Sequence, residues 1–102
     1  MPFRRLLAFV KYAQGSYRDA LDNIEVLGED FVSADLTLLK LRAFTLARCQ
    51  RYDAALKTLH EILDMPAVSE TDKREIARIF DALDRIRTVK HYEYLGNSRR
   101  HE

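Results

Sequence analysis

The chain has 102 residues, 47 % of them hydrophobic and 32 % charged, which excludes a disordered or collagen-like polypeptide and predicts one domain. Its 17 basic and 16 acidic side chains nearly cancel, so no overall field attracts nucleic acid or an anionic membrane. A single cysteine, Cys49, excludes an internal disulfide and favours a cytoplasmic setting, and no segment approaches the roughly 20 apolar residues that span a bilayer.

The first third of the sequence predicts a helical hairpin. Apolar residues recur at three- and four-residue spacings from Phe3 to Gln14, which is the period of a helix. Gly15 can adopt the left-handed conformation that ends this helix, and a second helix is expected from about Tyr17 to Gly28. In the linker 28–34, the apolar pair Phe31 and Val32 is expected to tuck beneath the hairpin.

A second hairpin is predicted to follow. Ser33 or Asp35 can cap a helix that runs to about Cys49, and this helix is apolar on more than half its circumference, as expected when neighbours cover it on two sides. After the turn at 50–51, a further helix is expected to end at Met65-Pro66, because a residue that precedes proline disfavours the helical conformation.

The last third predicts one long helix. Ser69 offers a hydroxyl cap, and apolar residues continue at helical spacing from Ile76 to Tyr92. Their repeated three-residue steps make the apolar stripe wander around the axis, a pattern that allows a kink or break near 87–90. We expect a capping helix over 71–95 and a frayed tail over 96–102.

One short motif occurs twice. The segment 14–21 returns as 49–56, so that Tyr17, Ala20 and Leu21 fall on Tyr52, Ala55 and Leu56, each 35 positions later. A fixed period of this size is typical of a solenoid of stacked helical hairpins. The repeated residues are expected to hold the hairpins together rather than to touch a ligand.

This pattern of a helix, a turn and then Tyr-x-x-Ala-Leu resembles the tetratricopeptide-repeat family. The resemblance places repeat 1 at about 2–34 and repeat 2 at about 35–68, with Ala8, Ala20, Ala43 and Ala55 at the family's small-residue positions. It implies an all-α fold, a right-handed superhelix of antiparallel helical hairpins. The sequence departs from the family at Arg4 and Leu39, where a large aromatic is usual, and repeat 1 lacks the terminal proline.

The resemblance also implies a function and a site. In this family the first helix of each repeat lines a concave groove that binds peptides or helices of partner proteins, so a non-enzymatic adaptor or chaperone is expected. Small proteins of this kind include chaperones of type III secretion, which is one candidate context. The implied groove residues are Arg5, Leu6, Phe9, Tyr12, Ala13, Lys40, Leu41, Phe44, Ala47, Arg48, Arg74, Arg78 and Asp81.

Two alternatives stay open, one for the role of Leu41 and Phe44 and one for the function of the chain. Leu41 and Phe44 can instead pack against the neighbouring repeat. A subgroup of the family clamps a terminal carboxylate with cations and asparagines, but Phe9 and Leu41 occupy the asparagine positions, so clamping is not expected. Two repeats also leave an apolar end uncovered, and homodimerisation through that end is the competing function.

Enzymatic and metal-binding motifs are not evident in the sequence, and no catalytic residue, cofactor or metal is expected. His60 and Asp64 share a helix face and can form a metal pair, but a surface hydrogen bond is favoured. Cys49 is interpreted as a small buried hydrophobe, and Asp81 with Asp84 as a solvated face rather than an acid pair. The basic residues after Arg85 are interleaved with acids, so nucleic-acid binding is not favoured either.

Overall fold

The structure, a computed structural model, describes residues 2–100, with side chains from Phe3 to Gly96. All of its regular elements are helices, and the part of the chain it describes has no strand, which confirms the all-α prediction. The helices are α1 (Pro2–Ala13), α2 (Tyr17–Leu27), α3 (Glu29–Ser33), α4 (Leu36–Arg48), α5 (Tyr52–Leu63) and α6 (Glu70–Arg100).

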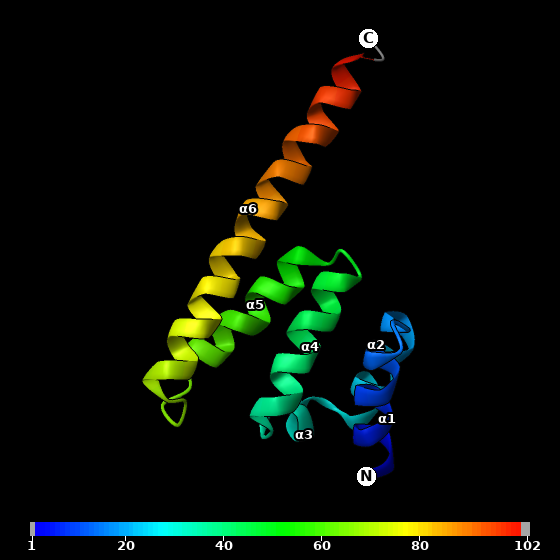
Figure 1. The fold of residues 1–102 in the computed structure, drawn as a ribbon, viewed down its shortest axis with the longest axis vertical. Coiled ribbons are helices and arrows are strands. Elements are labelled where there is room, and N and C mark those ends of the chain that lie inside the picture. The colour runs from blue at the N-terminus through cyan, green and yellow to red at the C-terminus, as the bar shows by residue number, and fades with distance from the viewer. Residues whose placement is uncertain (1, 101–102) are drawn as a thin grey trace.

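The helices are arranged as two hairpins and a long final helix (Figure 1). Helix α1 packs against α2, and α4 packs against α5, while the short α3 connects the two hairpins. Helix α6 packs along α5 with its first half, and its second half extends beyond the other helices (Figure 1). The molecule is therefore elongated, with extents of 52 × 31 × 21 Å.

The turns inside the two hairpins have the same backbone geometry. Gly15 and Gln50, which are 35 positions apart, both adopt positive φ, at 80° and 63°. Each lies in a Schellman turn: Gly15 N donates to Tyr12 O at 3.0 Å and Ser16 N to Lys11 O at 2.9 Å. The matching bonds of Gln50 to Ala47 and of Arg51 to Leu46 measure 3.0 and 2.9 Å. The sequence repeat is thus also a repeat of backbone structure.

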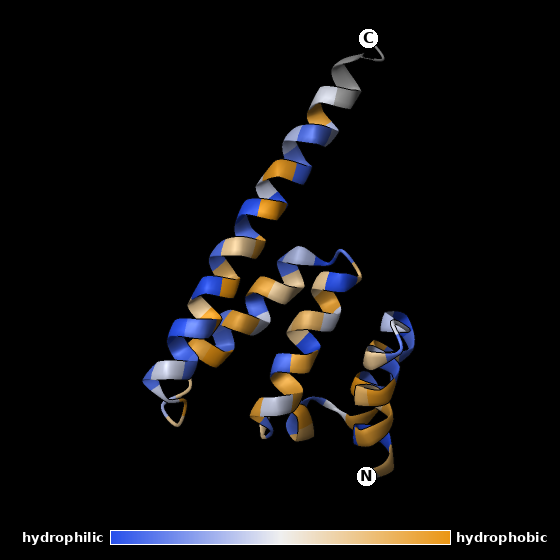
Figure 2. Cartoon of the chain, viewed as in Figure 1, coloured by the Kyte–Doolittle hydropathy of each residue, from blue (hydrophilic) through white to orange (hydrophobic). Residues whose placement is uncertain are grey.

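Small residues lie where the paired helices approach each other. Ala8, Ala20, Ala43 and Ala55 are all 0 % exposed, because a side chain of one methyl group lets helix backbones come close. The main core joins both hairpins and the start of α6, through Ile24, Leu38, Leu59, Ile62 and Ile76 among others. Figure 2 shows that the hydrophobic colour continues along α6 past the body of the molecule.

The linker between the hairpins differs from the prediction in one respect. Val32 is buried at 1 % exposure, as expected, but Phe31 is 42 % exposed. The prediction for Phe31 was wrong because residues 29–33 form a helical turn, α3, in which consecutive side chains point about 100° apart. Asp35, rather than Ser33, caps α4 by accepting a hydrogen bond from Leu38 N at 3.2 Å.

Helix α6 also runs further than the sequence indicated. It continues from Glu70 through Arg100, so the break that the pattern allowed near 87–90 does not occur and the predicted start of the tail at 96 was wrong; residues 101–102 lie outside the described residues. Arg87 donates to Asp84 at 2.6 Å on the same helix and to Asp53 on α5 at 2.8 Å. These bonds support the helix across this segment, where no glycine or proline interrupts it. At the start of α6, Ser69 Oγ accepts from Asp72 N at 3.2 Å, as predicted.

Candidate functional site

An apolar cavity of about 340 Å³ opens between α1, α4 and α6, beside the start of α5. Its walls come from segments far apart in the sequence, because the two hairpins and α6 converge there. The lining residues are Tyr12 of α1, Phe44, Ala47 and Arg48 of α4, Tyr52 of α5, and Ile79, Leu83 and Ile86 of α6. We call these eight residues the groove.

Helix α6 supplies one whole wall of the groove. Ile79, Leu83 and Ile86 are spaced i, i+4 and i+7, so they form one stripe over two helical turns. Ile79 and Leu83 also pack against the core, whereas Ile86 is 42 % exposed and lies at the open end of the stripe. The stripe is therefore rigid at its base and accessible at its end.

Three side chains form a cluster at the polar edge of the groove. The Arg48 guanidinium lies over the Tyr17 ring, 5.6 Å from the centroid, and the Tyr12 and Tyr17 rings meet edge to face with centroids 5.2 Å apart. Contact with the Tyr12 hydroxyl, and then the proximity of Tyr17, raise the pKa of Arg48 above its ordinary value. Arg48 is an exposed cation held by aromatic rings.

The other cations expected in the groove lie elsewhere. Arg5 Nε donates to Asp35 Oδ2 at 2.9 Å, and its guanidinium is 5.1 Å from the Phe9 ring centroid. Lys40 Nζ lies 3.5 Å from Asp72 Oδ1, which ties α4 to the start of α6. Arg74 and Arg78 are exposed on α6, and neither lines the cavity.

The expected apolar residues also separate into two groups. Of the residues that the resemblance implied for the groove, Tyr12, Phe44, Ala47 and Arg48 line the cavity. Leu41 is only 5 % exposed and belongs to the core, so the alternative in which it packs against neighbouring helices describes it correctly. Phe9 packs partly buried against the same core, and Leu6 is 63 % exposed outside the cavity.

Sequence reasoning missed part of the lining. Tyr52 belongs to the repeated motif that was expected to hold the hairpins together, yet it lines the cavity. The stripe from Ile79 to Ile86 was read as a capping pattern, although its spacing is that of a helix face that can accept a partner. That spacing is the signal that could have identified this wall.

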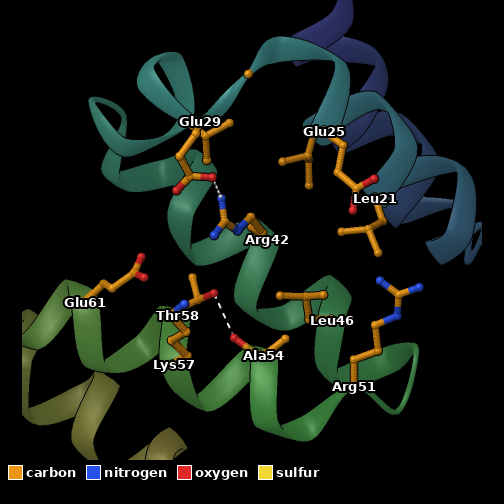
Figure 3. Close-up of a pocket in the computed structure, with 13 residues that line it drawn as sticks. Leu21, Glu25, Glu29, Arg42, Leu46, Arg51, Ala54, Lys57, Thr58 and Glu61 are labelled. Atoms are coloured by element: carbon orange, nitrogen blue, oxygen red, sulfur yellow. Dashed lines mark hydrogen bonds and ion pairs between the residues drawn. The ribbon is translucent and has the colours of Figure 1, made fainter.

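A second cavity, of about 430 Å³, opens on the opposite face of α4, between α2, α3 and α5 (Figure 3). Its walls carry charges of both signs, and Arg42 Nη1 lies 2.8 Å from Glu29 Oε2. The hydrogen bond from Arg42 is the main cause that lowers the pKa of Glu29. Opposite charges already face one another here, and this cavity is more polar than the groove.

The residues considered for chemistry lie apart from both cavities or are already paired. His60 Nδ1 lies 3.2 Å from Asp64 Oδ2, the surface contact that was favoured over a metal pair. Within the described residues, no cluster of three or more His, Cys, Asp or Glu side chains is placed to hold a metal ion. Asp84 bonds to Arg87, and Cys49 is half-buried against a small core cluster that includes Leu46.

Comparison with known proteins leaves the groove as the main guide to function. No protein-family model matches the chain, and neither a curated protein nor a solved structure matches it. None of the described helices has the length and apolar content needed to cross a membrane.

Proposed function

We propose that this chain is a non-enzymatic binding module that holds an amphipathic helix of a partner protein in the groove. The observation that carries the proposal is the apolar stripe of Ile79, Leu83 and Ile86, which forms one wall of a cavity lined also by Tyr12 and Phe44. Helices recognised in grooves present apolar anchors at the same i, i+3, i+4 and i+7 spacing.

The dimensions of the stripe suit a helix rather than an extended peptide. From Ile79 to Ile86 the α6 axis advances by about 10 Å, which is two turns of any helix laid along it. Helix α6 continues past the body of the molecule, with Val89 54 % exposed, so the wall is longer than the cavity itself. A partner helix of three or four turns would lie along α6 and insert its central apolar residues beside Phe44.

The superhelical, tetratricopeptide-like arrangement and a cytoplasmic adaptor or chaperone role belong to the same proposal. The repeat arrangement is supported by the 35-residue sequence repeat and by the equivalent turns at Gly15 and Gln50. A module of this type shields the apolar face of a partner helix, which is what a chaperone of an aggregation-prone helix requires.

A selection experiment with a matched pair of variants tests the proposal. Peptides that bind the wild-type chain would be selected from a displayed library of amphipathic helices, and their affinities measured by fluorescence polarisation. Ile86→Glu places a charge inside the groove and should weaken binding at least about tenfold, whereas Val26→Glu, at an exposed apolar position of α2 outside the groove, should change it less than about twofold. Failure to enrich helical peptides, or equal loss with both variants, would reject the groove as the binding site.

Self-association through α1 is a second candidate function. Phe3, Leu6 and Val10 form an uncovered apolar stripe, with exposures of 69, 63 and 40 %. Contiguous exposed apolar surface of this kind marks an interaction site in a soluble protein. Light scattering over a range of concentrations would show a dimer that Leu6→Glu dissociates; a wild-type monomer at every concentration would reject this function.

A further inference from the structure

Charge is segregated between the helices of the first hairpin and α4. Every charged residue of α1 and α4 is basic: Arg4, Arg5, Lys11, Lys40, Arg42 and Arg48. Helices α2 and α3 carry five acidic residues, Asp19, Asp22, Glu25, Glu29 and Asp30, against one basic residue, Arg18. The two helices that line the groove opposite α6 therefore carry only positive charge, and Arg48 is the cation that they place in its lining.

Most of these cations already pair with polar or acidic side chains of the same chain. Arg5, Lys40 and Arg42 pair with Asp35, Asp72 and Glu29 at 2.9, 3.5 and 2.8 Å. Arg4 donates to the Asn23 side chain, which is 7 % exposed, at 3.1 Å. These four interactions join different helices, so they hold the structure together and leave little charge for a ligand.

Arg48 differs from them. Among the described side chains, no carboxylate lies within ion-pair distance of its guanidinium, which contacts the Tyr17 ring and the Tyr12 hydroxyl. Lys11 has no paired carboxylate among them either, but it does not line the groove. Arg48 is thus the groove's own cation, and its charge is not neutralised by any described carboxylate.

The surroundings of Arg48 favour recognition of a carboxylate. The Tyr17 ring restrains the guanidinium, so less side-chain entropy is lost when it binds. A guanidinium presents planar donors that match the two oxygens of a carboxylate, and this geometry makes the paired hydrogen bonds both strong and selective. Tyr12, Phe44 and Leu83 lie on the same cavity, and a bound helix would exclude water there and strengthen the charge interaction.

We infer that Arg48 is the residue of the groove that determines specificity, and that it selects an amphipathic partner helix with an Asp or Glu side chain beside its central apolar residue. The inference rests on the proposed function, since it assigns a charge preference to the same groove. It also separates the cations that the resemblance implied for the groove into two that tie helices together, Arg5 and Lys40, and one, Arg48, that contacts the partner.

Three matched peptides test the inference. The probes are fluorescein-labelled helical peptides of one sequence, with leucines at i, i+3, i+7 and i+10 and with Glu, Gln or Lys at the flanking position next to the second leucine. The wild-type chain should bind the Glu peptide about tenfold or more tightly than the Gln peptide, because one charge-assisted pair is lost. The Lys peptide should bind more weakly still.

Variants of Arg48 then assign the preference to this residue. Arg48→Gln should make the Glu and Gln peptides equivalent within about twofold, and Arg48→Glu should reverse the order in favour of the Lys peptide. Arg18→Gln removes an exposed cation from α2, outside the groove, and should leave the preference unchanged. Circular dichroism would check that all variants keep the wild-type helix content.

The outcomes distinguish the inference from the function on which it rests. Binding with no preference for Glu, or with a preference that survives in Arg48→Gln, would overturn the assignment of Arg48 and leave the helix-binding groove intact. Tighter binding of the Lys peptide by the wild-type chain would likewise overturn it. If none of the three peptides binds, the proposed function and the inference both fail.

Discussion

Gln50→Gly is expected to stabilise the protein, although it removes a side chain. Gln50 adopts φ of 63°, a left-handed conformation that costs a residue with a Cβ about 1–2 kcal/mol. Glycine avoids that cost but loses about 0.5–1 kcal/mol more backbone entropy on folding, so the net gain should be about 0.5–1 kcal/mol. Because the Gln50 side chain is exposed, no packing is lost. For a chain of this size the gain corresponds to a rise in Tm of about 2–5 °C.

The reciprocal change at the equivalent turn is the control. A Cβ added to Gly15 would meet no atom within 4 Å, so Gly15→Ala should destabilise only through the backbone, which has φ of 80°, by about 1 kcal/mol. Urea unfolding followed by circular dichroism measures both changes. A loss of stability in Gln50→Gly, or no loss in Gly15→Ala, would refute the view that the two turns are equivalent positions of one repeat.

Three further changes test the packing of the fold. Asp35→Ala removes the cap of α4 and should lower the free energy of unfolding by at least about 1 kcal/mol at pH 7, as measured with urea. The hydrogen bond from Arg5 lowers the pKa of Asp35 from 3.8. The difference in stability between wild type and variant should therefore hold above pH 3.8 and shrink as the pH falls below it. If the difference grows on acidification, the assignment is wrong. Val32→Ala should cost about 2 kcal/mol and Phe31→Ala less than about 0.5 kcal/mol in the same assay, because only Val32 is buried; equal costs would contradict this. A chain that ends at Thr88 should lose helical signal yet unfold within about 1 kcal/mol of the wild type, because the described side chains after that residue are exposed; a larger loss would show that the end of α6 is packed.

Periodicity was sufficient to predict the helices other than α3, because their apolar faces are regular and their ends carry local signals. Gly15, Gly28 and Ser69 act through their own backbone or side-chain chemistry, which a sequence displays directly. The small residues such as Ala8 and Ala43 were also predicted, since close helix contact leaves room for little else.

It was harder to predict which apolar residues of a helix are covered by the neighbouring helices. Leu41 and Phe44 are both apolar and lie three residues apart on α4, yet one is in the core and the other lines the groove. Which of them is covered depends on where α6 and α5 pack, and no local pattern encodes that. Phe31 was misplaced because the helical turn of α3 changes which of two adjacent apolar residues faces inward.

The ion pairs could not be predicted from the sequence either. Arg5, Lys40 and Arg48 look alike as cations on helices that are otherwise largely apolar. The partners of the first two, Asp35 and Asp72, lie 30 and 32 positions away, so only the packing of the helices reveals that these charges are already used. The same packing brings Tyr17 under Arg48 and leaves that residue to face a partner.

Methyl NMR of the wild-type chain with a library-selected helical peptide tests the central claim most directly, since the competing surfaces carry different methyl groups. Binding in the groove predicts that the signals of Ile79, Leu83 and Ile86 shift on addition of the peptide. Shifts centred instead on Leu6 and Val10 of α1, or on the residues that line the charged cavity, which include Leu21, Ile24 and Val32, would contradict it.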